Sequence, residues 1–211
     1  MRVSTLRSII DNAITHEDKT HRLQRHLRGI ISELPNHLCL QQNNELESLE
    51  HFARQYISHV PEFLLALKQA AQVSGIESHV FPFLKVAEEY FITPPLLPHK
   101  HLGLMALMDE SYLAHRLFEE VNDRYISAVG IPLIPWDMTL ANVVAHQLVG
   151  EKLANELDEL VHQTVNTMMS SEHEYDSERF RKYVAAEKGN LTTIWQDWPC
   201  LSKSSGIEWA I

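Results

Sequence analysis

The sequence contains only two cysteines, Cys39 and Cys200, which lie far apart along the 211 residues. They form no C-x-x-C pair, so the sequence indicates neither a disulfide framework nor a cysteine zinc site. Glycine and proline are also scarce, with seven and nine residues, which excludes collagen-like and low-complexity chains. The remaining composition, 45% hydrophobic and 22% charged, is typical of one globular domain with a substantial core.

Positive charge is in deficit, because 18 Lys and Arg stand against 28 Asp and Glu, a formal net charge of -10. A surface of that sign repels phosphate backbones and anionic headgroups, so we expect no nucleic-acid partner and no membrane partner. No window approaches the roughly 18 apolar residues of a membrane span, and residues 1–7 lack the apolar stretch of a secretory signal. We therefore expect a cytoplasmic protein.

Apolar residues recur every three to four positions, and no run of two-residue alternation is bounded by turn signals. The sequence therefore predicts an all-α fold, a helical bundle. Two long antiparallel helices are expected at about 102–125 and 139–169, packed on shorter N-terminal helices. Residues 1–190 are expected to form a single domain with an internal corner at 93–101, where prolines cannot continue a helix.

Residues 191–211 are expected to form a C-terminal tail. Three of the four tryptophans lie in the last 17 residues, and exposed indole rings are costly in water. We therefore expect the tail to dock on the bundle or on a partner subunit. The apolar loop around Trp136 is likewise expected to pack against other protein surface.

Fingerprints of common enzymes are missing from the sequence, which has no G-x-x-x-x-G-K-[ST], G-x-G-x-x-G, H-E-x-x-H or G-x-S-x-G motif and no EF-hand loop. What is abundant is histidine, with 13 residues, alongside many carboxylates on predicted helices. In a helical bundle this combination raises the question of a metal centre.

Charged residues interrupt the apolar stripe of the helix predicted at 102–125. Plotted at 100° per residue, Asp109, Arg116 and Glu120 fall within roughly 40° of the stripe centre. His146 lies inside the apolar seam of the following helix, and antiparallel pairing would bring it towards Glu120. Carboxylates and imidazole from facing helices are ligands of non-haem iron or manganese, so Asp109, Glu120 and His146 are the candidate metal ligands.

Tyr112 and Arg116 flank these ligands and are candidate cofactor-binding residues. The alternative is an internal polar network without metal, in which Arg116 neutralises Asp109 and Glu120 while His146 hydrogen-bonds one of them. We favour the network, because a cation as close as Arg116 competes electrostatically with a bound metal.

Two further patterns add little to the metal hypothesis. The ferritin-type pattern, Glu-x-x-His on two helices, is approached by Asp18-x-x-His21 and matched by Glu159-x-x-His162, but the latter projects off the apolar seam. His115 and Glu119 lie one turn apart on the flank of the 102–125 helix, a spacing typical of a modest surface contact.

Two function classes follow. The first, which we favour, is a non-catalytic binding or interaction protein, expected to be a homo-oligomer, that binds a protein or a small apolar ligand through the Trp136 loop or the tail. The alternative is a metal-dependent enzyme, using iron or manganese, with its site between the two long helices.

Overall fold

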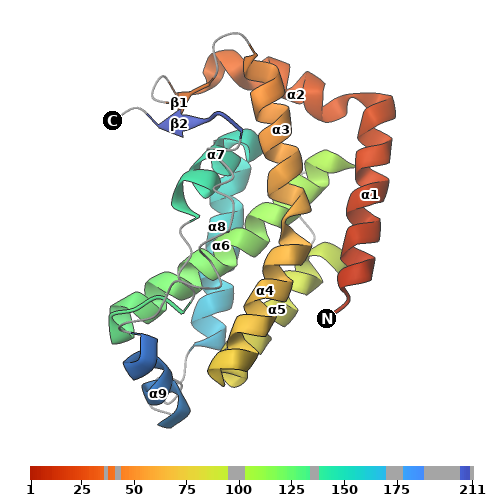
Figure 1. The fold of residues 1–211 in the computed structure, drawn as a ribbon. Coiled ribbons are helices and arrows are strands. Elements are labelled where there is room, and N and C mark those ends of the chain that lie inside the picture. The colour runs from red at the N-terminus through yellow and green to blue at the C-terminus, as the bar shows by residue number, and fades with distance from the viewer. Residues whose placement is uncertain are drawn as a thin grey trace.

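The computed structural model describes residues 1–35, 38–40, 44–94, 103–133, 138–169, 178–187 and 205–209. These residues form an all-α bundle, as the periodicity predicts, with a short antiparallel ribbon at one edge (Figure 1). The helices are α1 (Val3–Thr20), α2 (Arg22–Ile30), the 3-10 turn η1 (Ile31–Glu33), α3 (Glu45–Ser58), α4 (Val60–Ser74), α5 (Glu77–Ile92), α6 (Leu104–Val129), α7 (Thr139–Val149), α8 (Glu151–Met168) and α9 (Glu178–Glu187). The strands are β1 (Leu38–Cys39) and β2 (Glu208–Trp209).

Helix α6 is the centre of the bundle. Helices α1 to α5, α7 and α8 all contact it, and 16 of its 26 residues are buried. An amphipathic helix at a bundle surface buries one stripe, whereas a helix covered on several sides buries polar positions as well. This is why α6 carries Asp109, Glu110 and His115 in buried positions.

The helix predicted over 139–169 is divided into two at Gly150. This glycine has φ 93° and ψ 135°, a conformation that residues with a Cβ rarely adopt. A Cβ placed there would meet no atom within 4 Å, so the glycine serves the turn and does not serve a close helix contact.

Helix α7 runs antiparallel to α6, as the sequence predicts for this pair. Glu119 hydrogen-bonds Asn142 near the start of α7, while Tyr112, two turns earlier on α6, faces His146 one turn further along α7. The contacts therefore advance in opposite directions on the two helices.

Helix α8, in contrast, runs parallel to α6, so the antiparallel prediction is wrong for the second half of the 139–169 segment. Tyr112 contacts Asp158, and Arg124 contacts Asn166, so later residues of α6 meet later residues of α8. The physical reason is the reversal at Gly150, which turns the chain back along α6.

The last described segment closes onto the early part of the chain. Strand β2 pairs antiparallel with β1, with Leu38 opposite Trp209 and Cys39 opposite Glu208. Ile207, just before β2, is fully buried. These residues of the predicted tail thus pack on the same chain, whereas Trp195, Trp198, the Trp136 loop and most of the 93–101 corner lie outside the described residues.

Helix α9 is held by aromatic contacts at the far end of α6. The ring of Phe180, which is buried, lies 5.2 Å from that of Tyr125 and 4.8 Å from that of His79, measured between centroids. Tyr183 donates a hydrogen bond to the backbone carbonyl of Leu133 at 2.9 Å. Among all the described helices, none is both long and apolar enough to cross a membrane.

Candidate functional site

The structure does not bring the three predicted metal ligands together. Asp109 and Glu120 are eleven residues apart on the single helix α6, and a rise of 1.5 Å per residue separates them by about 16 Å along its axis. Glu120 pairs with Arg124 at 3.0 Å and lies 3.3 Å from Nδ1 of His162. Within the described part of the chain, no group of three His, Cys, Asp or Glu side chains is placed to hold a metal ion.

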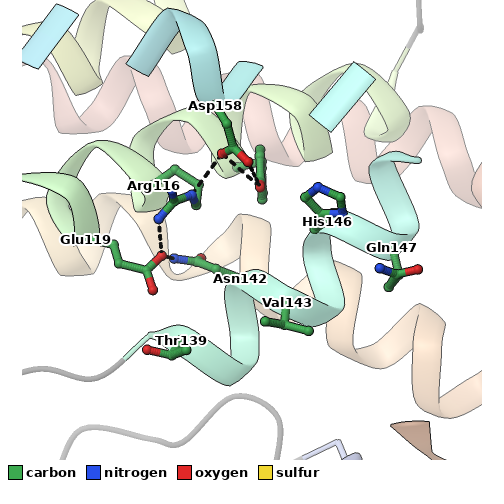
Figure 2. Close-up of a pocket in the computed structure, with 9 residues that line it drawn as sticks. Arg116, Glu119, Thr139, Asn142, Val143, His146, Gln147 and Asp158 are labelled. Atoms are coloured by element: carbon green, nitrogen blue, oxygen red, sulfur yellow. Dashed lines mark hydrogen bonds and ion pairs between the residues drawn. The ribbon is translucent and has the colours of Figure 1, made fainter. Parts of the chain in front are cut away.

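Three of the predicted site residues do meet, at a cavity of about 300 Å³ between α6, α7 and α8. They are Tyr112, Arg116 and His146. The lining residues from α6 and α7 follow helical spacing, so one face of each helix forms a wall. Figure 2 shows Thr139, Asn142 and Val143 of α7 below Arg116 and Asp158, with His146 and Gln147 of the same helix to the right. The lining residues are Tyr112, Arg116, Glu119, Thr139, Asn142, Val143, His146, Gln147 and Asp158.

On the α8 side of the cavity, Asp158 is the acceptor for two donors from α6. Nε of Arg116 donates to Oδ1 of Asp158 at 2.8 Å, and the phenol of Tyr112 donates to the same carboxylate at 3.0 Å. Tyr112 is buried, while the side chains of Arg116 and Asp158 are 22% and 29% exposed. The charges therefore lie at the cavity wall, partly withdrawn from water.

On the α7 side, Glu119 is the corresponding acceptor. Its Oε2 receives hydrogen bonds from Nη1 of Arg116 and from Nδ2 of Asn142, each at 2.5 Å. The Asn142 amide is itself fixed, because the buried phenol of Tyr56 on α3 donates to its Oδ1 at 2.7 Å. The network thus links α3, α6, α7 and α8.

The surroundings hold Arg116 and Tyr112 each in one protonation state. Burial alone would lower the pKa of Arg116, but its hydrogen bond to Asp158 and the charge of Glu119 outweigh burial and raise this pKa. Burial, followed by the charge of Asp158, raises the pKa of Tyr112 far above its ordinary value. The guanidinium therefore stays charged, and the phenol stays a neutral donor.

His146 lies on the α7 wall of the cavity and not among carboxylates. Its ring makes an edge contact with Tyr112, with the centroids 6.1 Å apart, and its Nε2 is 3.3 Å from Oδ1 of Asn155. The histidine is half-buried, so the cavity adds an imidazole to its amides, carboxylates and phenol. This set can donate and accept hydrogen bonds and carry charge of both signs.

His115 and Glu119, the predicted surface pair, lie in different environments in the structure. Glu119 lines the cavity, but His115 is fully buried, with its ring centroid 4.2 Å from that of Tyr56 and 5.6 Å from that of Phe63. Burial, and then the charge of His59, lowers the pKa of His115 to about 3, so its imidazole is neutral in the core. The surface prediction is wrong for His115, because α6 is covered on several sides.

Three lining residues of importance, Glu119, Asn142 and Asp158, were not among the predicted ligands. Asn142 carried a usable signal, since it is an amide inside the apolar run from Leu140 to Ala145. Asp158 carried none, because its position depends on the reversal at Gly150.

Comparison with known proteins adds no functional assignment. No protein-family model matches the chain, and neither the curated proteins nor the solved structures contain a significant match to it. The chemistry of the cavity is therefore the basis for assigning a function.

Proposed function

We propose that this protein is a non-catalytic binding protein that holds a small polar molecule in the cavity between α6, α7 and α8. The observation that carries the proposal is the continuous network from Tyr56 to Asp158 around an open cavity. Small-molecule sites combine concavity with a few convergent polar groups, which is the arrangement found here.

The size of the cavity limits the occupant. A volume of about 300 Å³ lies at the low end of ligand cavities, so a single-ring molecule or a compound of similar bulk fits best. The sequence led us to expect a protein or a small apolar ligand at the Trp136 loop or the tail. Eight of the nine residues that line the described cavity, all except Val143, carry a polar or charged group, and this favours a ligand with polar groups of its own.

The walls of the cavity are fixed before any ligand arrives. Arg116 is held by Asp158 and Glu119, and Asn142 is held by the buried Tyr56. Side chains that are already ordered lose little rotamer freedom on binding, so more of the interaction energy is available for affinity. This preorganisation supports a binding role.

The proposal is tested by blocking the cavity without breaking the network. Val143 lines the cavity and makes none of its hydrogen bonds, so Val143→Phe adds bulk at the α7 wall. Val73→Phe is the matched control, because Val73 on α4 is 73% exposed. The probe is a panel of one-ring fragments carrying amine, amidine, amide, carboxylate or hydroxyl groups, followed by saturation-transfer NMR.

We expect fragments that bind both the wild-type protein and Val73→Phe to lose their signal with Val143→Phe. Circular dichroism and the melting temperature confirm that both variants fold. If every fragment behaves identically with the three proteins, the cavity is not a binding site and the proposal fails.

A further inference from the structure

We infer that the ligand of the α6–α7–α8 cavity is a small organic cation with N–H donors, of the amidine or amine class, recognised by Glu119. This inference rests on the proposed function and specifies the chemistry of its ligand. It follows from the charge of the cavity wall and from the way the two carboxylates are used.

The fixed charges of the cavity do not cancel. Glu119 and Asp158 contribute two formal negative charges and Arg116 one positive charge, while Tyr112 stays neutral, so the wall carries a formal net charge of -1 when His146 is counted as neutral. The whole chain carries -10, which also attracts cations and repels anions over a longer range. An anionic ligand near Arg116 would stand beside both carboxylates, and their repulsion opposes its binding.

The two carboxylates differ in how their oxygens are occupied. Tyr112 contacts both oxygens of Asp158, at 3.0 and 3.1 Å, and Arg116 donates to one of them. At Glu119 both donors end on Oε2, and among the described residues none donates to Oε1. Figure 2 shows this second oxygen of Glu119 directed away from Arg116 and Asn142. Glu119 therefore retains acceptor capacity at the cavity.

The position of Glu119 strengthens this interaction. Its side chain is 18% exposed, so a cation bound there is partly shielded from water and pairs more strongly than at an open surface. Gln147 on the same wall carries a neutral side-chain oxygen that accepts N–H donors. A flat cation with several N–H groups uses the carboxylate and this oxygen together.

The test uses three molecules of nearly the same shape and different charge: benzamidine, benzamide and benzoate. Isothermal titration calorimetry of the full chain measures the affinity of each. We expect benzamidine to bind at least about tenfold more tightly than benzamide, since a charge-assisted hydrogen bond replaces a neutral one, and benzoate to bind most weakly.

The role of Glu119 is tested with Glu119→Gln, which keeps an acceptor for Arg116 and Asn142 but removes the negative charge. We expect benzamidine affinity to fall by about tenfold or more. Glu120→Gln is the matched control, because it removes the same charge one residue further along α6, where Glu120 pairs with Arg124 outside the cavity. We expect this control to change the affinity by less than about twofold.

Three results would overturn the inference. The first is that benzamidine fails to bind the wild-type protein, or binds no more tightly than benzamide or benzoate; this comparison needs no variant to fold. The second is an equal effect of Glu119→Gln and Glu120→Gln in folded proteins. The third is that the fragments blocked by Val143→Phe are neutral or anionic, in which case the cavity remains a binding site but its ligand class is different. If no fragment is blocked, the proposed function itself fails.

Discussion

Arg116 on α6 and Asp158 on α8 lie 42 positions apart in the chain, yet their Nε and Oδ1 atoms are 2.8 Å apart. The same separation of 42 recurs two turns later, where Arg124 donates to Asn166 at 2.7 Å. A constant separation means that the two helices lie parallel in a fixed register. The Arg116 to Asp158 pair therefore reports on both the cavity and the packing of α8.

Removing the guanidinium of Arg116 should destabilise the fold. Arg116→Met leaves Glu119 and Asp158 without their shared cation, and we expect the free energy of unfolding to fall by about 1–3 kcal/mol, less than for fully buried pairs because these groups are partly exposed. Urea denaturation measures this change. The matched substitution Arg124→Met removes a 38% exposed cation from the same helix and should cost under about 1 kcal/mol. Equal losses of unfolding free energy in the two variants would show that Arg116 contributes no more to stability than the exposed Arg124.

His115 should make the protein sensitive to acid. Its pKa is about 3 in the folded chain and 6.5 in the unfolded chain, so the unfolded state binds more protons between these values. Stability therefore falls as the pH drops from about 6.5 towards 3, by up to about 1.4 kcal/mol per pH unit.

This acid sensitivity is measured by urea denaturation of the wild type and of His115→Leu between pH 7 and pH 4. The variant lacks the titrating group, so its stability relative to the wild type should improve steadily as the pH falls. His51→Leu, at an exposed position of α3, should show no such trend. A difference between wild type and His115→Leu that stays constant with pH would contradict the neutral buried imidazole.

Glu110 should give the opposite pH dependence to His115, so that stability falls as the pH rises. Burial, and then the charge of Asp109, raises the pKa of Glu110 from 4.5 to about 8, so the folded state binds more protons between these values. The stabilising contribution is complete below pH 4.5 and is lost as the pH rises through 8.

The measurement for Glu110 is urea denaturation of Glu110→Gln at pH 5, 7 and 9. The variant should gain stability relative to the wild type by up to about 1.4 kcal/mol per pH unit up to pH 8, because an amide never ionises. Glu62→Gln, whose side chain is 44% exposed and paired with Arg7, serves as the control without this trend. A flat profile for Glu110→Gln would mean that the carboxyl ionises normally in the fold.

Gly150 should resist substitution. Gly150→Ala forces an L side chain into φ 93°, ψ 135°, and we expect a loss of about 1–3 kcal/mol although a Cβ meets no atom within 4 Å. Gly29→Ala is the contrasting variant, since Gly29 is an exposed residue within α2 and has equal space around it. That substitution should stabilise the protein by about 0.5–1 kcal/mol through helix propensity. Thermal and urea unfolding compare the two, and a harmless Gly150→Ala would refute the role of the turn.

The helical class and the approximate helix positions were predictable from local spacing, because apolar side chains at three- and four-residue intervals identify a buried face without knowledge of neighbours. The break at Gly150 was not, since the apolar seam continues in phase from Val143 to Leu157 across it. Periodicity reports which face is buried and contains no information on whether the next helix continues or reverses.

The same local spacing predicted part of the candidate site and missed the rest. Tyr112, Arg116 and His146 were singled out because they stand on or beside apolar stripes, and they do line the cavity. Glu119 and Asp158 lie off those stripes and resemble solvent-exposed charges until α7 and α8 are placed. Glu120 joins no set of ligands, because Arg124 pairs with it one turn further along α6 and His162 reaches it from α8, a helix whose placement the sequence did not predict.

Because α6 and α8 are parallel, the length of α7, the helix between them, determines how α8 is positioned against α6. Two parallel helices cannot be joined by a tight loop, and α7 is the rod that returns the chain to the start of α8. A single-residue insertion within Thr139–Val149 would rotate everything after it by about 100° and advance it by about 1.5 Å. Insertions or deletions there would therefore separate Asp158 from Arg116 while every cavity residue kept its identity.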